Sequence, residues 1–291
     1  MSIFAKGMDK VGSHARQESE VVYLESVRGG TAHPNAARMR PAPVPAEQRA
    51  EPLPINVVDF NLGLGRSTKA NGNVLTDAAL ANQFRRIKRA ILGLALDAES
   101  GLTARNVIAI TSPYAGEGKT YVASNLALSL AAEKELNVLL IDGDLECRGL
   151  SKAFGIAGRF GLADALAGDV DAIRNALYVD RALPSLFVIP AGSQRTDAEE
   201  LVATSRMKQI VAQFASGKRP TAIIIDCPPL LQHTSASVLA QLSGQIAIVC
   251  SADNTTMDSL AALEDKLPAD RSIGFILNRS KVAEVDYYKS R

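Results

Sequence analysis

The sequence NVIAITSPYAGEGKT at residues 106–120 ends in Gly118, Lys119 and Thr120, three residue types that suit the binding of phosphate. A short apolar run opens this stretch and an amphipathic segment, residues 121–132, follows it, so the pattern predicts a strand, a phosphate loop and a helix. The backbone N–H groups at the start of such a helix form an anion site. Lys119 would bring a positive charge to the β- and γ-phosphates, and the Thr120 hydroxyl would ligate Mg²⁺. The chemistry expected here is therefore the binding of a nucleoside triphosphate.

This loop and the first turn of the helix are expected to contact the nucleotide along a continuous run of backbone. The residues expected to do so are Ala115, Gly116, Glu117, Gly118, Lys119, Thr120 and Tyr121. The loop departs from the pattern G-x-x-x-x-G-K-[ST] at one position, because Pro113 stands where the pattern has its first glycine. We therefore interpret it as a variant of the phosphate loop.

Acidic residues follow two further apolar runs. Asp142 and Asp144 come after VLLI, and Asp226 comes after AIII. The carboxyl ends of parallel strands meet at one edge of a sheet, so the three carboxylates should lie beside the phosphate loop. One of these carboxylates would hold Mg²⁺, directly or through water. Another would accept a proton from an attacking hydroxyl or position a water molecule.

The last apolar run of the chain, FIL, ends in Asn278 and Arg279. A side-chain amide carries both a donor and an acceptor, so Asn278 could read the edge of an adenine. We include both residues among the expected nucleotide contacts, and ATP is the expected nucleotide.

Apolar runs that alternate with helical patterns define the expected fold. Continuous apolar strands separated by helices of ten or more residues predict a parallel sheet covered on both faces. The expected strands are residues 107–110, 137–141, 186–189, 221–225, 245–250 and 273–277. With right-handed crossovers this is an α/β fold, a doubly wound and mostly parallel sheet of the Rossmann-like P-loop NTPase kind, with ligands at the carboxyl ends of the strands.

The first 75 residues differ from the rest of the chain. They mix Gly, Pro, Ala and charges with little periodicity, and the run RMRPAPVPAEQRAEPLPI spaces its prolines so that neither a helix nor a central strand persists. We expect residues 1–75 to be a disordered or tethering segment. Within it VVYLESV at residues 21–27 has short strand character, and it either docks on the body or a partner or, as we expect, is a solvated extended piece. Residues 76–291 are expected to form one domain.

Charge and cysteine content exclude several classes of function. Lys plus Arg number 32 and Asp plus Glu number 31, so no global field selects nucleic acid or an anionic membrane. The three cysteines are widely spaced, which favours reduced thiols over a disulfide framework or a metal site. No apolar run reaches the length of about 18 to 20 residues that spans a bilayer. We expect a cytoplasmic protein without direct membrane insertion, so that any membrane association comes through a partner.

One further helix is expected before the phosphate loop. In TDAALANQFRRIKRAILGLAL, residues 76–96, apolar side chains recur at steps of three and four and define one buried face, with Thr76 or Asp77 as the N-cap. The opposite face carries four basic residues, Arg85, Arg86, Lys88 and Arg89. A basic face of this kind is either solvated or an oligomer contact, and the periodicity leaves both open.

From residue 83 onward the chain resembles the bacterial tyrosine kinases of polysaccharide export (BY-kinases). These are relatives of the deviant P-loop ATPases that include the chromosome-partition and septum-site proteins. The resemblance rests on the loop SPYAGEGKT, the acidic box LLIDGDLE, the Walker B strand IIIDCPP and the segment IPAGSQRTDAEEL at residues 189–201. The helix QFRRIKRAIL is similar to the E-x-x-R-x-x-R oligomerisation helix of the family, in the version found in kinases that accompany exosortase systems.

The resemblance implies an ATP- and Mg²⁺-dependent protein-tyrosine autokinase that regulates exopolysaccharide synthesis and export, with ATPase activity as a further expectation. In that reaction Thr120, Asp144 and Asp226 would hold Mg²⁺ directly or through water, and Asp142 would accept the tyrosine proton. The expected catalytic group is then Lys119, Asp142 and Asp144. It implies a homo-oligomer, such as a ring, with Gln83, Arg86 and Arg89 at the subunit contact. Tyr287 and Tyr288 match the tyrosine cluster that is autophosphorylated between subunits. A membrane-anchored chain-length or export protein is the implied activator, which would recruit the chain to the inner membrane.

Three departures from the family pattern leave alternatives open. Gln83 stands where the family has Glu, Glu146 stands where the acidic box usually has Arg, and the tyrosine cluster has two members. Glu146 reverses the sign of a charge expected close to Mg²⁺ and phosphate, where such a change acts strongly. One alternative is a catalytically weak ATP-binding regulatory adaptor of the export machinery. Another is a partition-type ATPase switch, against which Tyr114 and Ala115 stand in the place of a second lysine.

Overall fold

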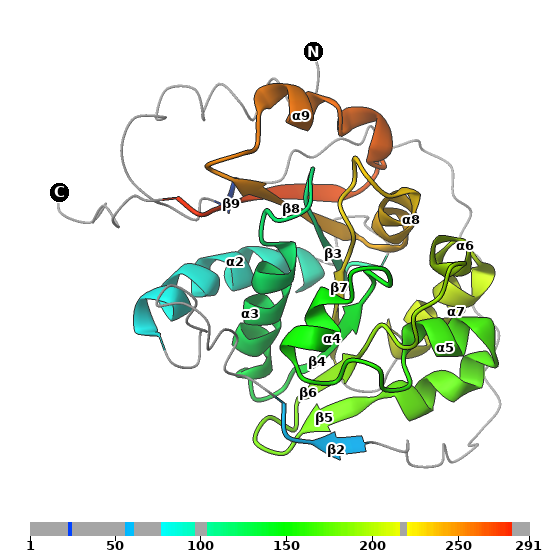
Figure 1. Ribbon diagram of the computed structural model, residues 1–291. Helices are drawn as coiled ribbons and strands as arrows, with labels where there is room; N and C mark the ends of the chain where they lie inside the picture. The colour runs from blue at the N-terminus through cyan, green and yellow to red at the C-terminus, as the bar shows by residue number, and fades with distance from the viewer. Residues whose placement is uncertain (1–22, 25–55, 61–76, 97–103, 216–219, 281–291) are drawn as a thin grey trace, which may run out of the picture.

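The computed structural model describes residues 23–24, 56–60, 77–96, 104–215 and 220–280. The strands within them are β1 Tyr23–Leu24, β2 Asn56–Val58, β3 Val107–Thr111, β4 Asn137–Asp142, β5 Tyr178–Asp180, β6 Leu186–Ile189, β7 Thr221–Asp226, β8 Gln245–Ser251 and β9 Ser272–Asn278. They form one sheet in the order β1-β9-β8-β3-β7-β4-β6-β5-β2 (Figure 1).

The centre of the sheet is parallel and consists of β9-β8-β3-β7-β4-β6. These six strands are the six that the apolar runs predict, and the doubly wound, mostly parallel α/β fold is confirmed. Every residue of β3 and of β8 is buried, as expected for strands that helices cover on both faces. Towards the edges, β1 pairs antiparallel with β9, β5 pairs antiparallel with β6, and β2 pairs parallel with β5.

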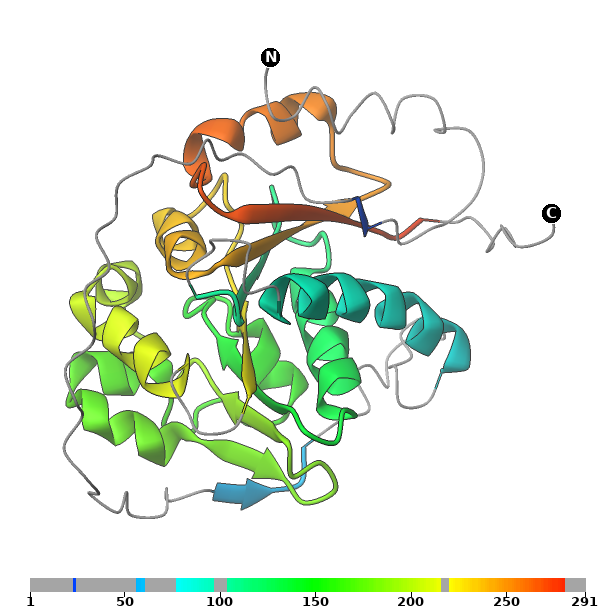
Figure 2. The same ribbon diagram turned by 180° about the vertical axis from the view of Figure 1, so that it is seen from behind.

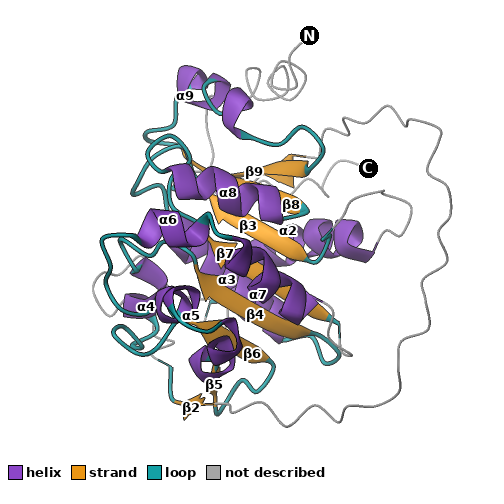
Figure 3. Ribbon diagram, turned by 90° about the vertical axis from the view of Figure 1, so that its right-hand side faces the viewer, coloured by secondary structure: helices purple, strands orange, loops and turns teal. Residues whose placement is uncertain are grey.

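Helices lie on both faces of this sheet. They are α2 Ala78–Leu96, α3 Lys119–Ala131, α4 Gly149–Ala153, α5 Leu162–Ala167, α6 Ala198–Val202, α7 Ser205–Ala215, α8 Thr234–Leu242 and α9 Met257–Ala261, with 3₁₀ turns η1 Val170–Ala176 and η2 Glu264–Lys266. Helices α2, α3 and α4 pack on one face and α5 to α8 on the other (Figures 1 and 3), which produces two cores. Alternation along β3 serves both, since Val107 and Ala109 belong to one core and Ile108 and Ile110 to the other.

Helix α2 begins where the sequence predicts. Oδ1 of Asp77 accepts hydrogen bonds from the N–H groups of Ala79, at 2.9 Å, and Leu80, at 3.1 Å, so Asp77 is the N-cap. Phe84 and Ile87 on its apolar face are 2% and 0% exposed and pack in the same core as α3, beside which α2 lies (Figure 2).

The basic face of α2 is narrower than the pattern predicts. Lys88 is turned towards α3, where its Nζ lies 2.5 Å from Oε1 of Glu133 and donates to the carbonyl of Ser129 at 3.3 Å. The long lysine side chain reaches this carboxylate from a half-buried position, so it does not belong to a solvated face. The residues of this face that are exposed are Arg85, Arg86 and Arg89.

Two short parts of residues 1–75, the segment expected to be disordered or tethering, belong to the sheet. Residues 23–24 pair with β9, so this part of the run predicted as a solvated piece is a strand. Asn56 of β2 lies opposite Tyr178, and the N–H of Phe60 donates to Oδ2 of Asp180 at 2.7 Å. The strand character of residues 21–27 was noted, but the solvated interpretation was preferred, and the three residues of β2 are too few to show periodicity.

Candidate functional site

The phosphate loop connects β3 to α3 through two glycines with left-handed backbone conformations. Gly116 has φ 81° and Gly118 has φ 100°, values that residues with side chains rarely adopt. A Cβ on Gly118 would also lie 2.1 Å from Nδ2 of Asn278, whereas a Cβ on Gly116 would meet nothing within 4 Å. The backbone conformation at Gly118 therefore favours glycine, and any side chain there would also have to displace the end of the Asn278 side chain.

Side chains hold the start of this loop and leave its later amides open. The N–H of Tyr114 donates to Oε2 of Glu117 at 2.8 Å, and the N–H of Ala115 donates to Oε1 of Gln232 at 2.9 Å. Among the described residues, the N–H groups of residues 116–118 have no hydrogen-bond acceptor. Three successive amides in this conformation can bind an anion such as a phosphate.

Glu117 is an anchor of the loop. It is 1% exposed, its Oε1 accepts a hydrogen bond from the hydroxyl of Thr255, and its backbone carbonyl accepts one from Nδ2 of Asn278 at 2.9 Å. Oγ1 of Thr255 in turn accepts from the N–H of Ser251 at 2.7 Å. The loop is thus tied to the ends of β8 and β9. Asn278, expected at the adenine, uses its amide N–H₂ on the loop backbone.

Lys119 points at Asp144. Its Nζ lies 3.5 Å from Oδ2 of Asp144, and the two residues are 8% and 2% exposed. Oδ1 of Asp144 accepts the N–H of Cys147 at 3.0 Å, which closes a turn directly after β4. The pair therefore brings the first residue of α3 to the carboxyl end of β4, as the sequence predicts for these two residues.

Asp142 and Asp226 end β4 and β7 at opposite positions of the parallel ladder. Both are 0% exposed. Oδ2 of Asp142 accepts hydrogen bonds from the N–H and the hydroxyl of Ser151, at 2.8 and 2.6 Å. Oδ1 of Asp142 and both carboxyl oxygens of Asp226 have no partner with full hydrogen-bond geometry among the described residues. Buried carboxyl oxygens without donors are a place where a cation would be stabilised.

Burial raises the pKa values of both carboxyls. It raises the pKa of Asp142 to about 7, with a further contribution from the charge of Asp144. Burial, and then the charge of Asp142, raises the pKa of Asp226 well above its ordinary value, while the Thr120 hydroxyl and the charge of Lys119 oppose the rise. The charges of Asp144 and Lys119 and the Thr120 hydroxyl thus act on these two buried carboxyls, so the phosphate-loop residues and the three carboxylates converge in one place.

The oxygen donors fit Mg²⁺ held by few protein ligands. Mg²⁺ usually takes one or two carboxylates and completes its shell with water and phosphate oxygens. Thr120, Asp144 and Asp226, the predicted ligands, would supply such a partial set. In the part of the chain that the structure describes, no group of three or more His, Cys, Asp or Glu side chains is arranged to hold a metal ion. Phosphate oxygens and water would therefore have to complete the shell.

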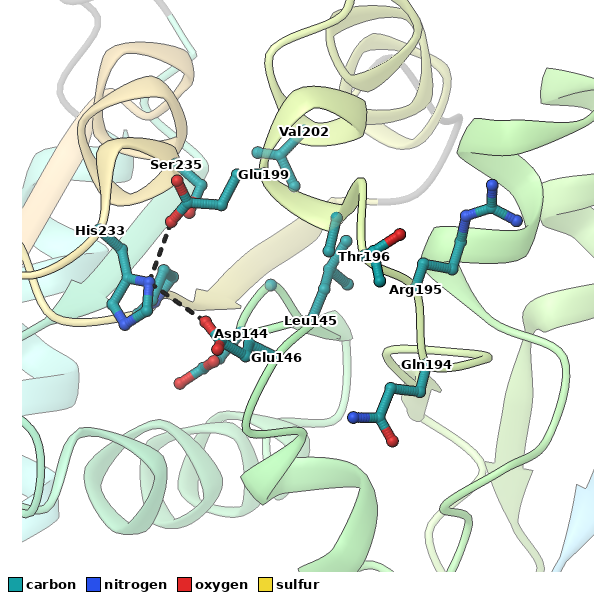
Figure 4. Close-up of a pocket in the computed structure, with 13 residues that line it drawn as sticks. Asp144, Leu145, Glu146, Gln194, Arg195, Thr196, Glu199, Val202, His233 and Ser235 are labelled. Carbon is teal, nitrogen blue, oxygen red and sulfur yellow. Dashed lines mark hydrogen bonds and ion pairs between the residues drawn. The ribbon is translucent and has the colours of Figure 1, made fainter.

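A cavity of about 310 Å³ adjoins Asp144 (Figure 4). Nδ1 of His233 lies 2.9 Å from Oε1 of Glu199 and 3.5 Å from Oε2 of Glu146 on its wall. Burial raises the pKa of Glu199, but hydrogen bonds from Thr234 and His233 outweigh burial and leave it below its ordinary value. Glu146, the charge reversal in the acidic box, thus lies against His233 on the wall of this cavity.

The other predicted residues lie on three separate elements or outside the described residues. Tyr121 is half-buried in the first turn of α3, and burial raises the pKa of its phenol. Arg279 is exposed at the end of β9, with φ 61°. The residues predicted for oligomerisation lie on α2, where Gln83 is half-buried and Arg86 and Arg89 are exposed. The predicted phosphorylation sites, Tyr287 and Tyr288, lie outside the described residues.

Sequence reasoning missed the residues that support the site from other segments: Ser151, Gln232, His233, Glu199 and Thr255. None of them has a spacing that signals its role, because each acts on a residue of another loop. None of the helices that the structure describes has both the length and the apolar character needed to cross a membrane.

Comparisons with known proteins agree on the kind of domain. A family model described as an AAA domain matches residues 105–268. The chain is 34% identical over 152 residues to the putative tyrosine-protein kinase AmsA of Erwinia amylovora, an alignment that covers 52% of this chain and 20% of AmsA. It is 29% identical over 216 residues to the succinoglycan biosynthesis transport protein ExoP of Rhizobium meliloti, covering 72% of this chain and 26% of ExoP.

The chain therefore spans about a fifth of AmsA and a quarter of ExoP. Among solved structures, the BceF tyrosine kinase domain is similar, with a TM-score of 0.58 and 25% sequence identity. That similarity covers 68% of this chain and 76% of the BceF chain.

Proposed function

Because this chain belongs to the AAA domain family, whose model matches residues 105–268, we propose that it is an ATP- and Mg²⁺-dependent protein-tyrosine autokinase. Its similarity to proteins named as tyrosine kinases supports this activity. Its similarity to ExoP supports a role in the synthesis and export of an exopolysaccharide. The observation that carries the proposal is the approach of the Lys119 ammonium to Asp144, beside the buried pair Asp142 and Asp226.

In the proposed reaction the phenol oxygen of a tyrosine forms a bond to the γ-phosphorus, and the bond from that phosphorus to the β–γ bridging oxygen breaks, releasing ADP. Lys119 and the loop N–H groups stabilise charge on the transferring group. Oδ1 of Asp142, which has no hydrogen-bond donor among the described residues, takes the phenol proton. A pKa of about 7 suits a base that works near neutral pH. Bound Mg²⁺, held by Thr120, Asp144 and Asp226, would neutralise charge on the phosphates.

The acceptors in this proposal are Tyr287 and Tyr288 of a neighbouring copy. Each phosphorylation adds roughly 1.5 to 2 negative charges, and the receiving site already holds three carboxylates, so the product would be repelled. Assembly through Gln83, Arg86 and Arg89 and release after phosphorylation would then form a cycle. A membrane-anchored export protein would activate the chain and hold it at the inner membrane.

The test is incubation of the purified chain with γ-labelled ATP and Mg²⁺. We expect label on tyrosine, a loss of at least about a hundredfold with Lys119→Met, and loss of label when Tyr287 and Tyr288 are both Phe. Lys134→Met, an exposed lysine beyond the other end of α3, is the matched control and should behave like the natural chain. Free phosphate without labelled tyrosine would instead identify an ATPase switch, and neither product would identify a regulatory adaptor.

A further inference from the structure

The cavity beside Asp144 combines acidic and apolar groups (Figure 4). Glu146 and Glu199 stand together on one side, and we call these two residues the acidic wall. Leu145 and Val202, which are 4% and 1% exposed, also line the cavity. Such a pocket suits an aliphatic chain that ends in a positive charge, because the stem can pack on apolar side chains while the cation meets the carboxylates.

His233 contacts both glutamates of the acidic wall but leaves one carboxylate oxygen of Glu146 without a partner among the described residues. Its Nδ1 contacts Oε1 of Glu199 at 2.9 Å, and the Thr234 hydroxyl donates to Oε2 of Glu199 at 2.9 Å, so both oxygens of Glu199 are engaged. Glu146 differs, because its side chain is 69% exposed and its Oε1 has no partner among the described residues. A positively charged ligand would therefore form an ion pair with Glu146. The carboxylate of Glu199 would attract it from a longer distance.

The arginines near this cavity have partners of their own. Arg195 lines it but donates two hydrogen bonds to the carboxylate of Asp197, at 2.7 and 2.9 Å. Arg148 donates to Oε1 of Gln194 at 3.0 Å. Figure 4 shows the Arg195 side chain directed away from the acidic wall. The Asp197 carboxylate balances the charge of Arg195, and Arg148 does not line the cavity, so a ligand in the cavity meets the negative charge of the acidic wall.

We propose that the acidic wall binds the positive side chain that follows the acceptor tyrosine in a second copy of this chain. The proposal rests on the proposed kinase function and names a determinant of its acceptor specificity. Asp144 supports the location, because it lines the cavity and also pairs with Lys119 of the transfer site. A peptide that places a tyrosine at this site therefore has the cavity within reach of its next few residues.

The sequence around the predicted acceptors fits this cavity. Residues 286–291 read DYYKSR, so Lys289 comes two positions after Tyr287. In an extended peptide, side chains two positions apart project to the same side and are separated by about 7 Å. In such a peptide Tyr287 and Lys289 would enter the site and the cavity together, whereas Tyr288 would point to the other side. The preferred acceptor is therefore Tyr287.

The binding test uses a fluorescent peptide of residues 282–291 and the full chain carrying Lys289→Gln, so that its own segment competes less. The dissociation constant is measured by fluorescence anisotropy for the natural peptide and for a peptide with Lys289→Gln. We expect the substituted peptide to bind about fivefold more weakly, the size of effect typical of a partly exposed ion pair. Glu146→Gln in the full chain should weaken the natural peptide by a similar factor and change the substituted peptide little.

Glu200→Gln is the matched control, since Glu200 is exposed on α6 next to Glu199 but does not line the cavity. It should leave both constants unchanged, and Glu146→Lys should bind a Lys289→Glu peptide better than the natural one. Equal affinity for the two peptides, or equal weakening of both by Glu146→Gln, would overturn the proposal. Binding requires no phosphoryl transfer, so this result is independent of whether the chain labels tyrosine. Mass spectrometry of labelled protein should find phosphate on Tyr287 first, and phosphate first on Tyr288 would refute the register.

Discussion

Asp142 and Asp226 lie directly opposite each other at the carboxyl ends of β4 and β7. The N–H of Gly143 donates to the backbone carbonyl of Asp226 at 2.9 Å, and a Cβ on Gly143 would lie 2.9 Å from the Ile225 side chain. The ends of β4 and β7 can therefore approach this closely only because residue 143 has no side chain. Two buried carboxyls held side by side disfavour double ionisation until a cation joins them.

The first prediction is that the protein loses stability as the pH rises when Mg²⁺ and nucleotide are absent. The pKa of Asp142 is about 7 in the folded protein against an ordinary value of 3.8. Between these values the folded state keeps a proton that the unfolded state has released, so stability falls as the pH rises through this window. Asp226 shifts in the same direction. Thermal unfolding in a chelator should therefore give a lower Tm at pH 8 than at pH 5.5.

Asp142→Asn is the control for that experiment. The amide keeps an oxygen for Ser151 and carries no charge, so the variant should melt roughly 2–8 °C above the natural chain at pH 8. Its Tm should also change less between the two pH values. Mg²⁺ with ATP should raise the Tm of the natural chain more at pH 8 than at pH 5.5. An identical pH dependence in both proteins would mean that Asp142 is not the titrating group.

The second prediction concerns Ser151, which holds Asp142 from α4. Its hydroxyl donates to Oδ2 of Asp142 at 2.6 Å and accepts the N–H of Ala191 at 2.8 Å. Ser151→Ala leaves that N–H unpaired, so the free energy of unfolding should fall by about 1–3 kcal/mol. The pKa of Asp142 should rise further, because a hydrogen bond that lowers it is lost.

The measurement is the pH dependence of the autophosphorylation rate. Its rising limb should move to higher pH in Ser151→Ala. Ser129→Ala on α3 is the control, since the hydroxyl of this serine contacts no carboxyl of the site among the described residues. If both variants keep the natural pH profile, Asp142 does not set that limb.

The third prediction separates two roles of Asn278. The structure shows its amide donating to the Glu117 carbonyl, so Asn278→Ala should loosen the phosphate loop and weaken ATP and GTP by a similar factor, about fivefold for one lost hydrogen bond. Recognition of adenine would instead weaken ATP more than GTP. Titration with fluorescent analogues of both nucleotides distinguishes these outcomes. Arg279→Ala, at the exposed neighbouring position, is the control. It measures how much any substitution at the end of β9 changes the nucleotide affinity.

The elements that the sequence predicts well are those with long periodic signals. Each of the six central strands is a continuous apolar run, and their parallel order brings Asp142, Asp144 and Asp226 to one edge whatever the loops do. Short edge strands lack such a signal, which is why β2 was missed and why β1 was noted only as a segment of strand character, without a place in the sheet. The contact between Glu117 and Asn278 was missed for another reason, because it joins residues 161 positions apart.

The contact of Glu146 was also not predictable from the sequence. Its place two residues after Asp144 suggests a position near Mg²⁺ and phosphate. In the turn after β4, Asp144 accepts the N–H of Cys147 through Oδ1 and the N–H of Arg148 through its carbonyl. This turn brings Glu146 into contact with His233, a partner that the sequence does not indicate. His233 comes from the segment after β7, and only the folded chain reveals that this segment passes beside the acidic box.

The fourth prediction compares two glycines of the phosphate loop. Gly116→Ala and Gly118→Ala both force a side chain into the left-handed region, at a cost of roughly 1–2 kcal/mol each. Gly118→Ala has a second cost, because its Cβ would lie 2.1 Å from Nδ2 of Asn278. Urea unfolding should therefore show a larger loss of stability for Gly118→Ala than for Gly116→Ala.

A double-mutant cycle isolates this second cost. Asn278→Ala removes the atom that would clash with the new Cβ. The free energy of unfolding of the double variant should therefore fall by less than the sum of the losses in the two single variants. Simple additivity would show that the backbone conformation alone makes Gly118 necessary. Nucleotide affinity measured on the same four proteins should follow the same order.

The last prediction tests the basic face of α2. Arg86 and Arg89 share the spacing of the E-x-x-R-x-x-R pattern with Gln83, whereas Arg85 is exposed on the same helix outside that pattern. If the face is a subunit contact, Arg86→Ala with Arg89→Ala should reduce the mass measured by light scattering to that of a smaller species. Arg85→Ala should leave the mass unchanged, and both proteins should keep their Tm within the small range typical of surface substitutions.

Gln83→Glu restores the carboxylate of the family pattern beside these arginines and should strengthen assembly. This effect should fall at high salt, because charges near the surface are screened. An unchanged mass in the double variant would mean that this face is only solvated.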